Sequence, residues 1–393
     1  MKIIRAEVLV VKLPRSSSYT WRSLQVPIGE MTLLRLETDT GLVGLGEAPA
    51  IMSWGGEHGR YFGEDSETIS YVMRRYFWPV LLNSDPLDST PLLSRLNAEV
   101  RGHVYAKAML ECALLDIVGK ALGVPVYQLL GGASRRSIPV CHSVGITSPE
   151  DAANIALRAI NEGIQHLQVK VPGEPADDLK IMSSIRQAIG DDPKIYPDVN
   201  RGYGDAKTAI ASTNAMKEEA DIAGIEQPVE GRDLMARVTD AIDIPVIIDE
   251  GCWSPYDAYE VARDRLADII SIYFTKAGGL QRAVQIGVIA NAAGLPVNVN
   301  GSLEGGVGNA ANLHLCAALE GTVLPAVIPV TTLEGREQNK FGGVFYNDDV
   351  ITEPFFYGDG MLDVPDGPGL GVELNPEKLE KYLINKVEMN QST

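Results

Sequence analysis

The sequence predicts an α/β protein whose larger part is a parallel β/α barrel, and two observations support this class. From about residue 138 onward, short apolar runs alternate with amphipathic helical stretches in seven or eight units of roughly 25 residues each. Units of this length supply parallel strands with helical crossovers, and a barrel accommodates eight of them. A doubly wound sheet is the alternative, but no GxGxxG motif follows the early strands.

The segment 1–125 is predicted to be an α+β domain. Its first run is rich in Ile and Val, which is typical of a strand, and two further runs flank the turn Asp39-Thr40-Gly41 as the arms of a β-hairpin. The last helical segment is apolar nearly all round, so we expect it to be buried. The predicted elements are a strand at 2–13, hairpin arms at 31–38 and 42–47, and helices at about 66–82, 87–99 and 104–122.

Two irregular stretches of this segment, about 16–30 and 48–65, are predicted to be specificity loops. Loops of that length inside a compact domain are usually functional or disordered. Aromatic side chains there would exclude water and hold a ring or the apolar face of a sugar, although each could instead pack within its own loop. The candidate substrate-binding residues are Tyr19, Trp21, Trp54 and Tyr61, and His58, Arg60 and Phe62 are further lid candidates.

The barrel is predicted to span 126–335. Helix signals separate its strands, for example Ser148-Pro149-Glu150, which places a cap before a proline at the first helical position. The tail, 336–393, is rich in Gly and Pro up to a short helix near 376–384, and we expect it to fold back onto the first domain. The candidate strands are 138–144, 167–171, 195–199, 222–226, 246–249, 269–274, 295–299 and 324–330.

Composition excludes several classes of function. The 393 residues carry a formal net charge of −18, which argues against a nucleic-acid partner and against an anionic membrane surface. Four cysteines lie far apart without CxxC spacing, so neither a disulfide framework nor a thiolate zinc site is expected. The N-terminus lacks a signal-peptide pattern, and no run of about 18 apolar residues occurs. We therefore expect a soluble cytoplasmic protein.

One lysine and three acids end successive predicted strands. Lys170, Asp198, Glu226 and Asp249 are separated by 28, 28 and 23 residues, about one β/α unit each. Because active-site groups of a barrel come from the carboxyl ends of several strands, these side chains should converge on one mouth. Three carboxylates cannot share a pocket in ionised form without a cation, and an all-oxygen site suits Mg²⁺ or Mn²⁺. The alternative places each acid on a surface loop, but turn residues follow each of them in phase.

An ordered set of motifs resembles the enolase superfamily, and in particular its mandelate racemase/muconate lactonizing branch. The motifs are Gln168-Val-Lys170, Asp198-Val-Asn200, Glu226-Gln-Pro228, Asp249-Glu250-Gly251 and Ala277-Gly278-Gly279, and Ser302-Leu-Glu304-Gly-Gly-Val-Gly308 is similar to the muconate-lactonizing subgroup. The resemblance implies a modified (β/α)7β barrel of the TIM type, under an α+β capping domain that the C-terminal tail completes. It also implies a homo-oligomer.

The resemblance further implies that Asp198, Glu226 and Asp249 bind one Mg²⁺, with Mn²⁺ as the alternative. The supporting residues around these ligands would be Gln168, Asn200, Glu250 and Lys276. The shared chemistry of the superfamily is removal of a proton α to a carboxylate, which gives an enediolate that a divalent ion stabilises. Lys170 is the candidate base, and partial desolvation near the metal should lower its pKa toward 7.

Two departures from the family pattern restrict the reaction. Many relatives carry Lys-x-Lys on the second strand, but the first of these positions is Gln168 here, and an amide cannot act as a base. Where relatives have an opposing lysine five residues before the Gly-Gly pair, this chain has Tyr273, which could act as an acid, orient substrate or simply pack. Glu304 could protonate the substrate or be a helix N-terminal acid.

The predicted function is therefore dehydration or cycloisomerisation of a small carboxylate such as a sugar acid or a muconate-like lactone. A racemase or epimerase that uses Lys170 and Tyr273 is one alternative. A Schiff-base barrel with Lys170 as nucleophile is another, but it leaves three clustered acids unexplained. A non-catalytic metal-binding barrel is the third alternative.

Overall fold

Eight parallel strands surround the centre of the larger domain. In the computed structural model, which describes residues 1–16, 18–24, 27–335 and 341–391, neighbouring strands of this sheet are paired in chain order. A parallel bridge between Val140 and Ala326 joins the first strand to the last, so the sheet closes into a barrel as predicted. The strands are β5 (Cys141–Val144), β6 (His166–Lys170), β7 (Lys194–Asp198), β8 (Ile225–Glu226), β9 (Val246–Ile248), β10 (Ile269–Ile272), β11 (Val297–Asn300) and β12 (Val323–Val327).

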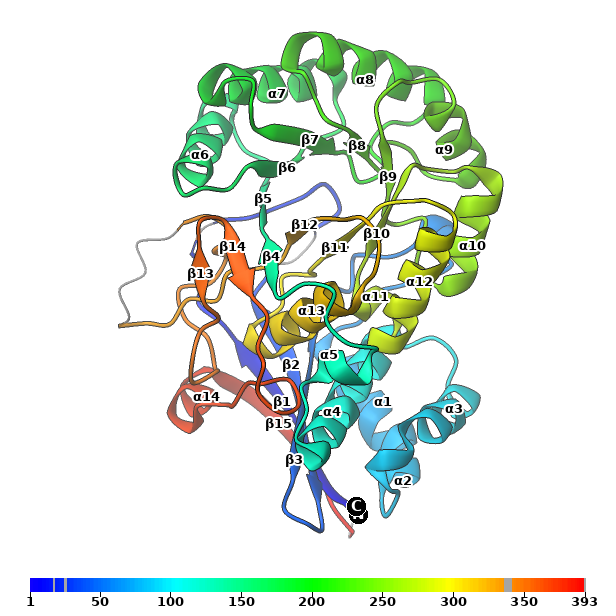
Figure 1. Cartoon of the computed structure of the whole chain (residues 1–393), viewed down its shortest axis with the longest axis vertical. Coiled ribbons are helices and arrows are strands. Elements are labelled where there is room, and N and C mark those ends of the chain that lie inside the picture. Colours follow the sequence, from blue (N-terminus) through cyan, green and yellow to red (C-terminus); the bar gives the residue numbers. More distant parts are fainter. Residues whose placement is uncertain (17, 25–26, 336–340, 392–393) are drawn as a thin grey trace.

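Helices cover the outside of this sheet (Figure 1). The first backbone N–H groups of a helix have no partner inside the helix, so a capping side chain often accepts a hydrogen bond from one of them. Ser148 caps the first of these helices in this way, and Asp205 caps the third. Each helix connects one strand to the next, as the (β/α)7β order requires. They are α6 (Pro149–Asn161), α7 (Pro175–Ile189), α8 (Ala206–Ala220), α9 (Arg232–Thr239), α10 (Pro255–Asp264), α12 (Leu280–Ala292) and α13 (Gly306–Ala318), with the short α11 (Phe274–Ala277) before α12.

The N-terminal segment forms an antiparallel sheet of order β15-β1-β2-β3. Helix α4 packs against β3 so closely that a Cβ atom at Gly46 would lie 1.9 Å from the Met109 carbonyl oxygen. The elements are β1 (Ile3–Lys12), β2 (Glu30–Thr38), β3 (Val43–Pro49), α1 (Ser66–Val72), α2 (Trp78–Leu81), α3 (Ser89–Glu99), α4 (Val104–Leu122), α5 (Val126–Leu129), the π-helical turn η2 (Met73–Phe77), and the 3-10 turns η1 (Glu57–Gly59) and η3 (Pro86–Asp88).

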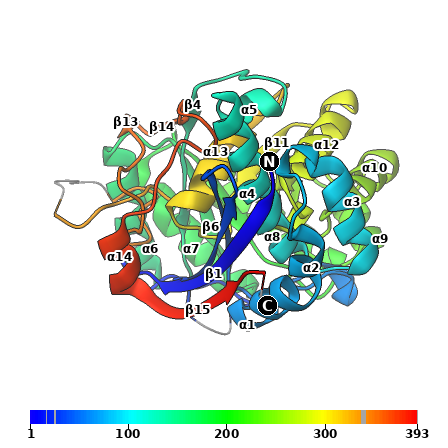
Figure 2. The same ribbon diagram turned by 90° about the horizontal axis from the view of Figure 1, so that it is seen from below.

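The C-terminal strand β15 (Leu383–Met389) pairs with β1, and Figure 2 shows the two strands side by side. Helix α14 (Pro376–Tyr382) precedes it. This arrangement is the α+β cap completed by the tail. Of the regions named from the sequence, residues 17 and 25–26 of the first loop, and 336–340 and 392–393 of the tail, lie outside the described residues.

The predicted single strand 138–144 is wrong in one respect. The chain forms two strands there: β4 (Ser137–Pro139) pairs with β14 (Met361–Asp363) of the tail, and only β5 enters the barrel. The tail strand β14 in turn pairs with β13 (Tyr357–Gly358). An apolar run specifies burial but not the partner strand, so the sequence could not separate the two.

A small apolar layer fills the barrel, mostly below the strand ends. Cys141, Tyr196, Ile247, Ile269 and Val327 form it, from five different strands. Because side chains alternate along a strand, the next inward positions lie one layer higher, toward the carboxyl ends. None of the helices within the described ranges combines the length and the hydropathy needed to cross a bilayer.

Candidate active site

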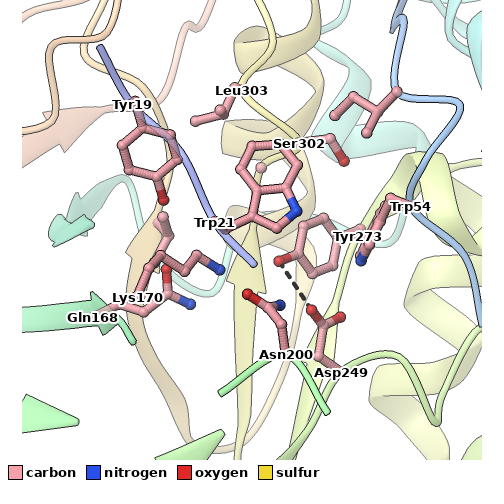
Figure 3. Close-up of a pocket in the computed structure, with 13 residues that line it drawn as sticks. Tyr19, Trp21, Trp54, Gln168, Lys170, Asn200, Asp249, Tyr273, Ser302 and Leu303 are labelled. Carbon is pink, nitrogen blue, oxygen red and sulfur yellow. Dashed lines mark hydrogen bonds between the residues drawn. The ribbon is translucent and has the colours of Figure 1, made fainter. Parts of the chain in front are cut away.

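A pocket opens at the carboxyl ends of the barrel strands and is covered by both N-terminal loops. It encloses about 450 Å³ including its open mouth. Figure 3 shows Lys170 and Gln168 on one side, Tyr273 and Asp249 on the other, and Trp21 between them. The described residues that line it are Tyr19, Trp21, Ile51, Trp54, Gln168, Lys170, Asn200, Asp249, Tyr273, Gly301, Ser302, Leu303 and Val327.

Strand β6 supplies Gln168 and Lys170 on its inward face. The Gln168 amide nitrogen donates to Glu226 Oε2 at 2.6 Å and lies 3.4 Å from Asp198 Oδ2, so one side chain reaches two acids. The Ser143 hydroxyl donates to Gln168 Oε1 at 2.6 Å, which fixes the orientation of the amide. Since that proton of Ser143 is already used, the Tyr19 hydroxyl, 2.6 Å away, is the donor to Ser143. A chain of hydrogen bonds thus runs from the first loop to Glu226.

Four carboxylates lie at this mouth and are almost completely buried. Asp198 and Glu226 are 0% exposed, and Asp249 and Glu250 are 1% exposed. The Asn200 amide nitrogen lies 3.5 Å from Asp198 Oδ2 and 3.2 Å from Glu250 Oε1, so it joins two of them. The structure therefore brings together the acids that the sequence placed at separate strand ends.

The acids repel one another, and the cations nearby do not balance them. Burial, with the charges of Asp198 and Asp249, holds the pKa of Glu226 well above its usual range. Burial and the same neighbours raise the pKa of Glu250 to about 8. Glu226 Oε1 and Glu250 Oε2 are buried without a hydrogen-bond partner. Buried, unpartnered carboxylate oxygens fit a hard divalent cation.

The acids are not arranged as a ready-made coordination cluster. Within the described part of the chain, no group of three or more His, Cys, Asp or Glu side chains has the arrangement needed to hold a metal ion. Two lysines contact these acids instead: Lys170 is hydrogen-bonded to Asp198 Oδ2, and Lys276 donates to Asp249 Oδ1 at 2.7 Å. These ammonium groups stand where positive charge is needed.

The expected fall in the pKa of Lys170 is wrong for this arrangement. Burial by itself would lower that pKa, but the charges of Asp198 and Glu226, together with the hydrogen bond to Asp198, outweigh burial and raise it. The sequence could place Lys170 among acids but could not show that its ammonium would contact one of them directly. An ion pair of this kind stabilises the charged form of the amine.

Lys276 and Tyr273 both contact Asp249 from the strand β10 side. Lys276 is 0% exposed and donates to the Asp249 carbonyl at 2.8 Å, to Asp249 Oδ1, and to the Ser271 carbonyl at 3.0 Å. All three of its N–H bonds are therefore used inside the protein. The Tyr273 hydroxyl lies 3.5 Å from Asp249 Oδ2, and its ring lines the pocket (Figure 3).

Left-handed backbone turns the chain at three strand ends. Asn200, Arg201, Gln227 and Leu303 have φ values of 44°, 63°, 36° and 62°. Gln227 then accepts from the backbone N–H groups of Asp249 and Gly251, at 2.9 and 3.2 Å. Such conformations cost energy in residues other than glycine, and they cluster at functional sites.

The second loop docks on the barrel through aromatic stacking and one buried acid. Trp54 lines the pocket and lies between Trp253 and Tyr273, at ring-centroid distances of 5.2 and 5.0 Å. Tyr61, predicted to bind substrate, is not among the described lining residues; it stacks on Trp253 at 5.3 Å and donates to Asp257 Oδ2 at 2.9 Å. The correction has a physical reason: Tyr61 holds the loop to the barrel instead of facing the pocket.

Glu304, predicted to be catalytic, lies behind the pocket wall. It is 0% exposed, and its Oε2 accepts from Asn312 of α13 at 3.2 Å. The left-handed Leu303 places Ser302 and Leu303 toward the pocket and directs the carboxylate of Glu304 toward α13. Burial raises the pKa of Glu304 to about 7. This geometry does not support direct contact between Glu304 and a substrate.

Sequence reasoning missed Ser143, which holds Gln168, and several residues of the pocket lining. Ser143 could have been found, because alternation along 141–144 puts it on the same face as Cys141, inside the barrel. Ile51, Leu303 and Val327 carry no chemical signal of their own, and only the assembled loops bring them to the pocket.

Two family models match this chain, one over the N-terminal domain and one over the barrel. Residues 5–131 match the family described as mandelate racemase/muconate lactonizing enzyme, N-terminal domain. Residues 151–378 match the family described as enolase C-terminal domain-like.

Individual relatives match over nearly the whole chain. Muconate cycloisomerase 1 of Rhodococcus opacus is 32% identical over 392 residues, which is 98% of this chain and 99% of the relative. The crystal structure of N-succinyl Arg/Lys racemase from Bacillus cereus superposes with a TM-score of 0.87 at 26% identity, over 99% of this chain and 100% of that one. A dipeptide epimerase from Cytophaga hutchinsonii, complexed with Mg and the dipeptide D-Ala-L-Val, gives 0.87 at 25% identity, with the same coverage.

Proposed function

Because the chain belongs to the mandelate racemase/muconate lactonizing enzyme family of the enolase superfamily and is an isomerase or lyase of that superfamily, we propose that it is Mg²⁺-dependent and removes the α proton of a small carboxylate. The observation that carries the proposal is the group of buried carboxylates facing Lys170, with unpartnered oxygens on Glu226 and Glu250. The Mg named with the Cytophaga dipeptide epimerase supports the same metal.

Asp198, Glu226 and Asp249 are the proposed metal ligands, and Glu250 and Asn200 support them. The bound ion would supply positive charge where the enediolate oxygens become negative. Gln168 holds Glu226 in place through its amide, and Lys276 does the same for Asp249. These two contacts hold the carboxylates in place and leave Lys170 and Tyr273 for proton transfer.

Lys170 is the proposed base, because it is the lysine whose side chain lines the pocket. A metal ion held by Asp198 would weaken the ion pair that keeps this amine protonated. Tyr273 faces it across the pocket (Figure 3) and, as a phenol, holds its proton at neutral pH. One base opposite one donor favours two reactions. In dehydration Lys170 takes the α proton, and the β hydroxyl leaves as water with a proton from Tyr273. In cycloisomerisation ring closure at the β carbon generates the enediolate, and Lys170 in its ammonium form gives the α carbon its proton. Dehydration and cycloisomerisation are therefore the proposed reactions.

Racemisation or epimerisation is the second candidate. Lys170 and Tyr273 lie on opposite sides of the pocket, as a two-sided proton transfer needs, and two of the relatives are named as a racemase and an epimerase. In this reaction Tyr273 would return a proton to the face opposite Lys170. Replacement of Tyr273 by Phe would then abolish inversion while leaving α-proton exchange through Lys170.

The test measures α-proton exchange in D₂O over a panel of small carboxylic acids, together with Mg²⁺ binding by calorimetry. Asp198→Asn should lose tight Mg²⁺ binding and exchange, and Lys170→Met should lose exchange but keep Mg²⁺ binding. Asp192→Asn, at an exposed site, is the matched control and should keep both. Full retention of binding and exchange by Asp198→Asn would contradict the proposal, and Mg²⁺ binding without exchange of any acid would indicate a non-catalytic barrel.

A further inference from the structure

We infer that the pocket selects a small monocarboxylic acid whose remaining part is uncharged and largely apolar, and that it rejects a second carboxylate or a chain of hydroxyls. The inference rests on the proposed function, which places the substrate's carboxylate at the end of the pocket with the metal ligands. It concerns the opposite end, which the two N-terminal loops and the last strands of the barrel enclose.

The walls away from the acids are aromatic and aliphatic. Tyr19, Trp21 and Trp54 of the loops are 8%, 7% and 5% exposed. Ile51 and Leu303, which share this lining, are each 5% exposed. A ligand group held here is therefore almost fully removed from water, and apolar area gains about 25 cal/mol per Å² on such transfer.

Four polar side-chain atoms of these walls already have partners within the protein. Besides the Trp54 indole N–H, this leaves mainly ring faces and methyl groups for the ligand, so a sugar-like chain would lose its bonds to water and gain few replacements. The internal bonds are Tyr19 OH with Ser143 Oγ (2.6 Å), Trp21 Nε1 with Ser23 Oγ (3.0 Å), Tyr273 OH with Asp249 Oδ2 (3.5 Å) and Ser302 Oγ with Thr275 Oγ1 (3.0 Å).

Among the described lining residues, no cation is free to pair with a second carboxylate at this end. Of the described lining residues, Lys170 and Asp249 alone are charged. Lys276 uses all three N–H bonds inside the protein, and Arg201 contacts Glu250 at 3.5 Å and Glu230 at 3.6 Å. An unpaired carboxylate buried among rings is strongly disfavoured.

The experiment compares two acids of nearly equal shape, 2-hydroxy-4-methylpentanoate and malate, in which an isobutyl group replaces a carboxymethyl group. Threonate is the polyhydroxy probe. Binding to the Mg²⁺-loaded protein is followed by tryptophan fluorescence, because Trp21 and Trp54 line the pocket. We expect 2-hydroxy-4-methylpentanoate to bind at least about tenfold more tightly than malate or threonate. Equal affinities, tighter binding of malate or threonate, or failure of 2-hydroxy-4-methylpentanoate to bind would overturn the inference.

A pair of variants at Ile51 separates charge from shape. Ile51→Arg introduces the missing cation and should raise the affinity for malate at least about tenfold, whereas Ile51→Met keeps the wall apolar and should leave the preference unchanged. Unchanged malate binding in Ile51→Arg would count against the reasoning. If the preference holds but no acid exchanges its α proton in D₂O, the proposed chemistry fails while the selectivity stands.

Discussion

Replacement of Lys276 by Met tests whether the buried ammonium is what balances Asp249. The side chain is 0% exposed and donates to three acceptors, two of them on Asp249. Methionine has similar length but no charge, so Asp249 would remain buried without its cation. Removal of one partner from a buried ion pair typically costs about 3–5 kcal/mol.

This cost converts into a measurable shift in melting temperature. At about 2.1 cal/mol/K per residue, 393 residues give an unfolding entropy of about 0.8 kcal/mol/K. We therefore expect Lys276→Met to melt about 4–6 °C below wild type in EDTA. Added Mg²⁺ should restore more stability to the variant than to wild type, because a cation bound at Asp249 then replaces the missing charge, and a ligand at 100 times its Kd contributes about 2.7 kcal/mol.

Lys107→Met is the matched control for this experiment. Lys107 is also buried, at 8% exposure, but its ammonium donates to the Val100 carbonyl at 2.6 Å, and burial lowers its pKa to about 8. Its loss should cost less, and the response to Mg²⁺ should equal that of wild type. The reasoning is refuted if Lys276→Met melts no lower than Lys107→Met, or if Mg²⁺ stabilises Lys276→Met no more than wild type.

Three further changes test other buried contacts. Burial raises the pKa of Glu304 from 4.5 to about 7, so the stability that its neutral form provides declines as pH rises above 4.5 and is lost by about pH 7. The unfolding free energy of Glu304→Gln relative to wild type should therefore increase by about 2 kcal/mol from pH 5 to pH 8 in urea titrations. Asp257→Ala leaves several buried donors unpaired, so it should cost about 3–5 kcal/mol and expose residues 48–65 to limited proteolysis. Gly46→Ala puts a methyl group 1.9 Å from the Met109 carbonyl oxygen and should cost at least about 2 kcal/mol in thermal unfolding, whereas Gly204→Ala, with nothing within 4 Å, should be tolerated.

Each of these three predictions would be contradicted by a specific result. A pH-independent difference between Glu304→Gln and wild type would mean that Glu304 does not hold a proton in the folded state near neutral pH. Wild-type resistance of residues 48–65 to protease in Asp257→Ala would show that other contacts dock the loop. Equal melting of the Gly46 and Gly204 variants would mean that α4 can move away from β3 at little cost.

The barrel and the convergence of its acids were predictable because both depend on local periodicity. Alternation along a strand puts Gln168 and Lys170 on one face, and the repeat of one β/α unit puts Asp198, Glu226 and Asp249 at the same end of successive strands. The run 138–144 shows where this reasoning stops, since two strands of different sheets share one apolar pattern.

The sequence by itself determined which chemical groups are present and at which end of the barrel they lie. The tertiary structure alone decided which atoms meet. Lys170 contacts Asp198, Tyr61 stacks on Trp253, and Glu304 points to α13 while Leu303 faces the pocket. The physical reason is that these contacts depend on backbone torsions at the strand ends and on loops that dock from distant segments, and neither leaves a periodic signal in the chain.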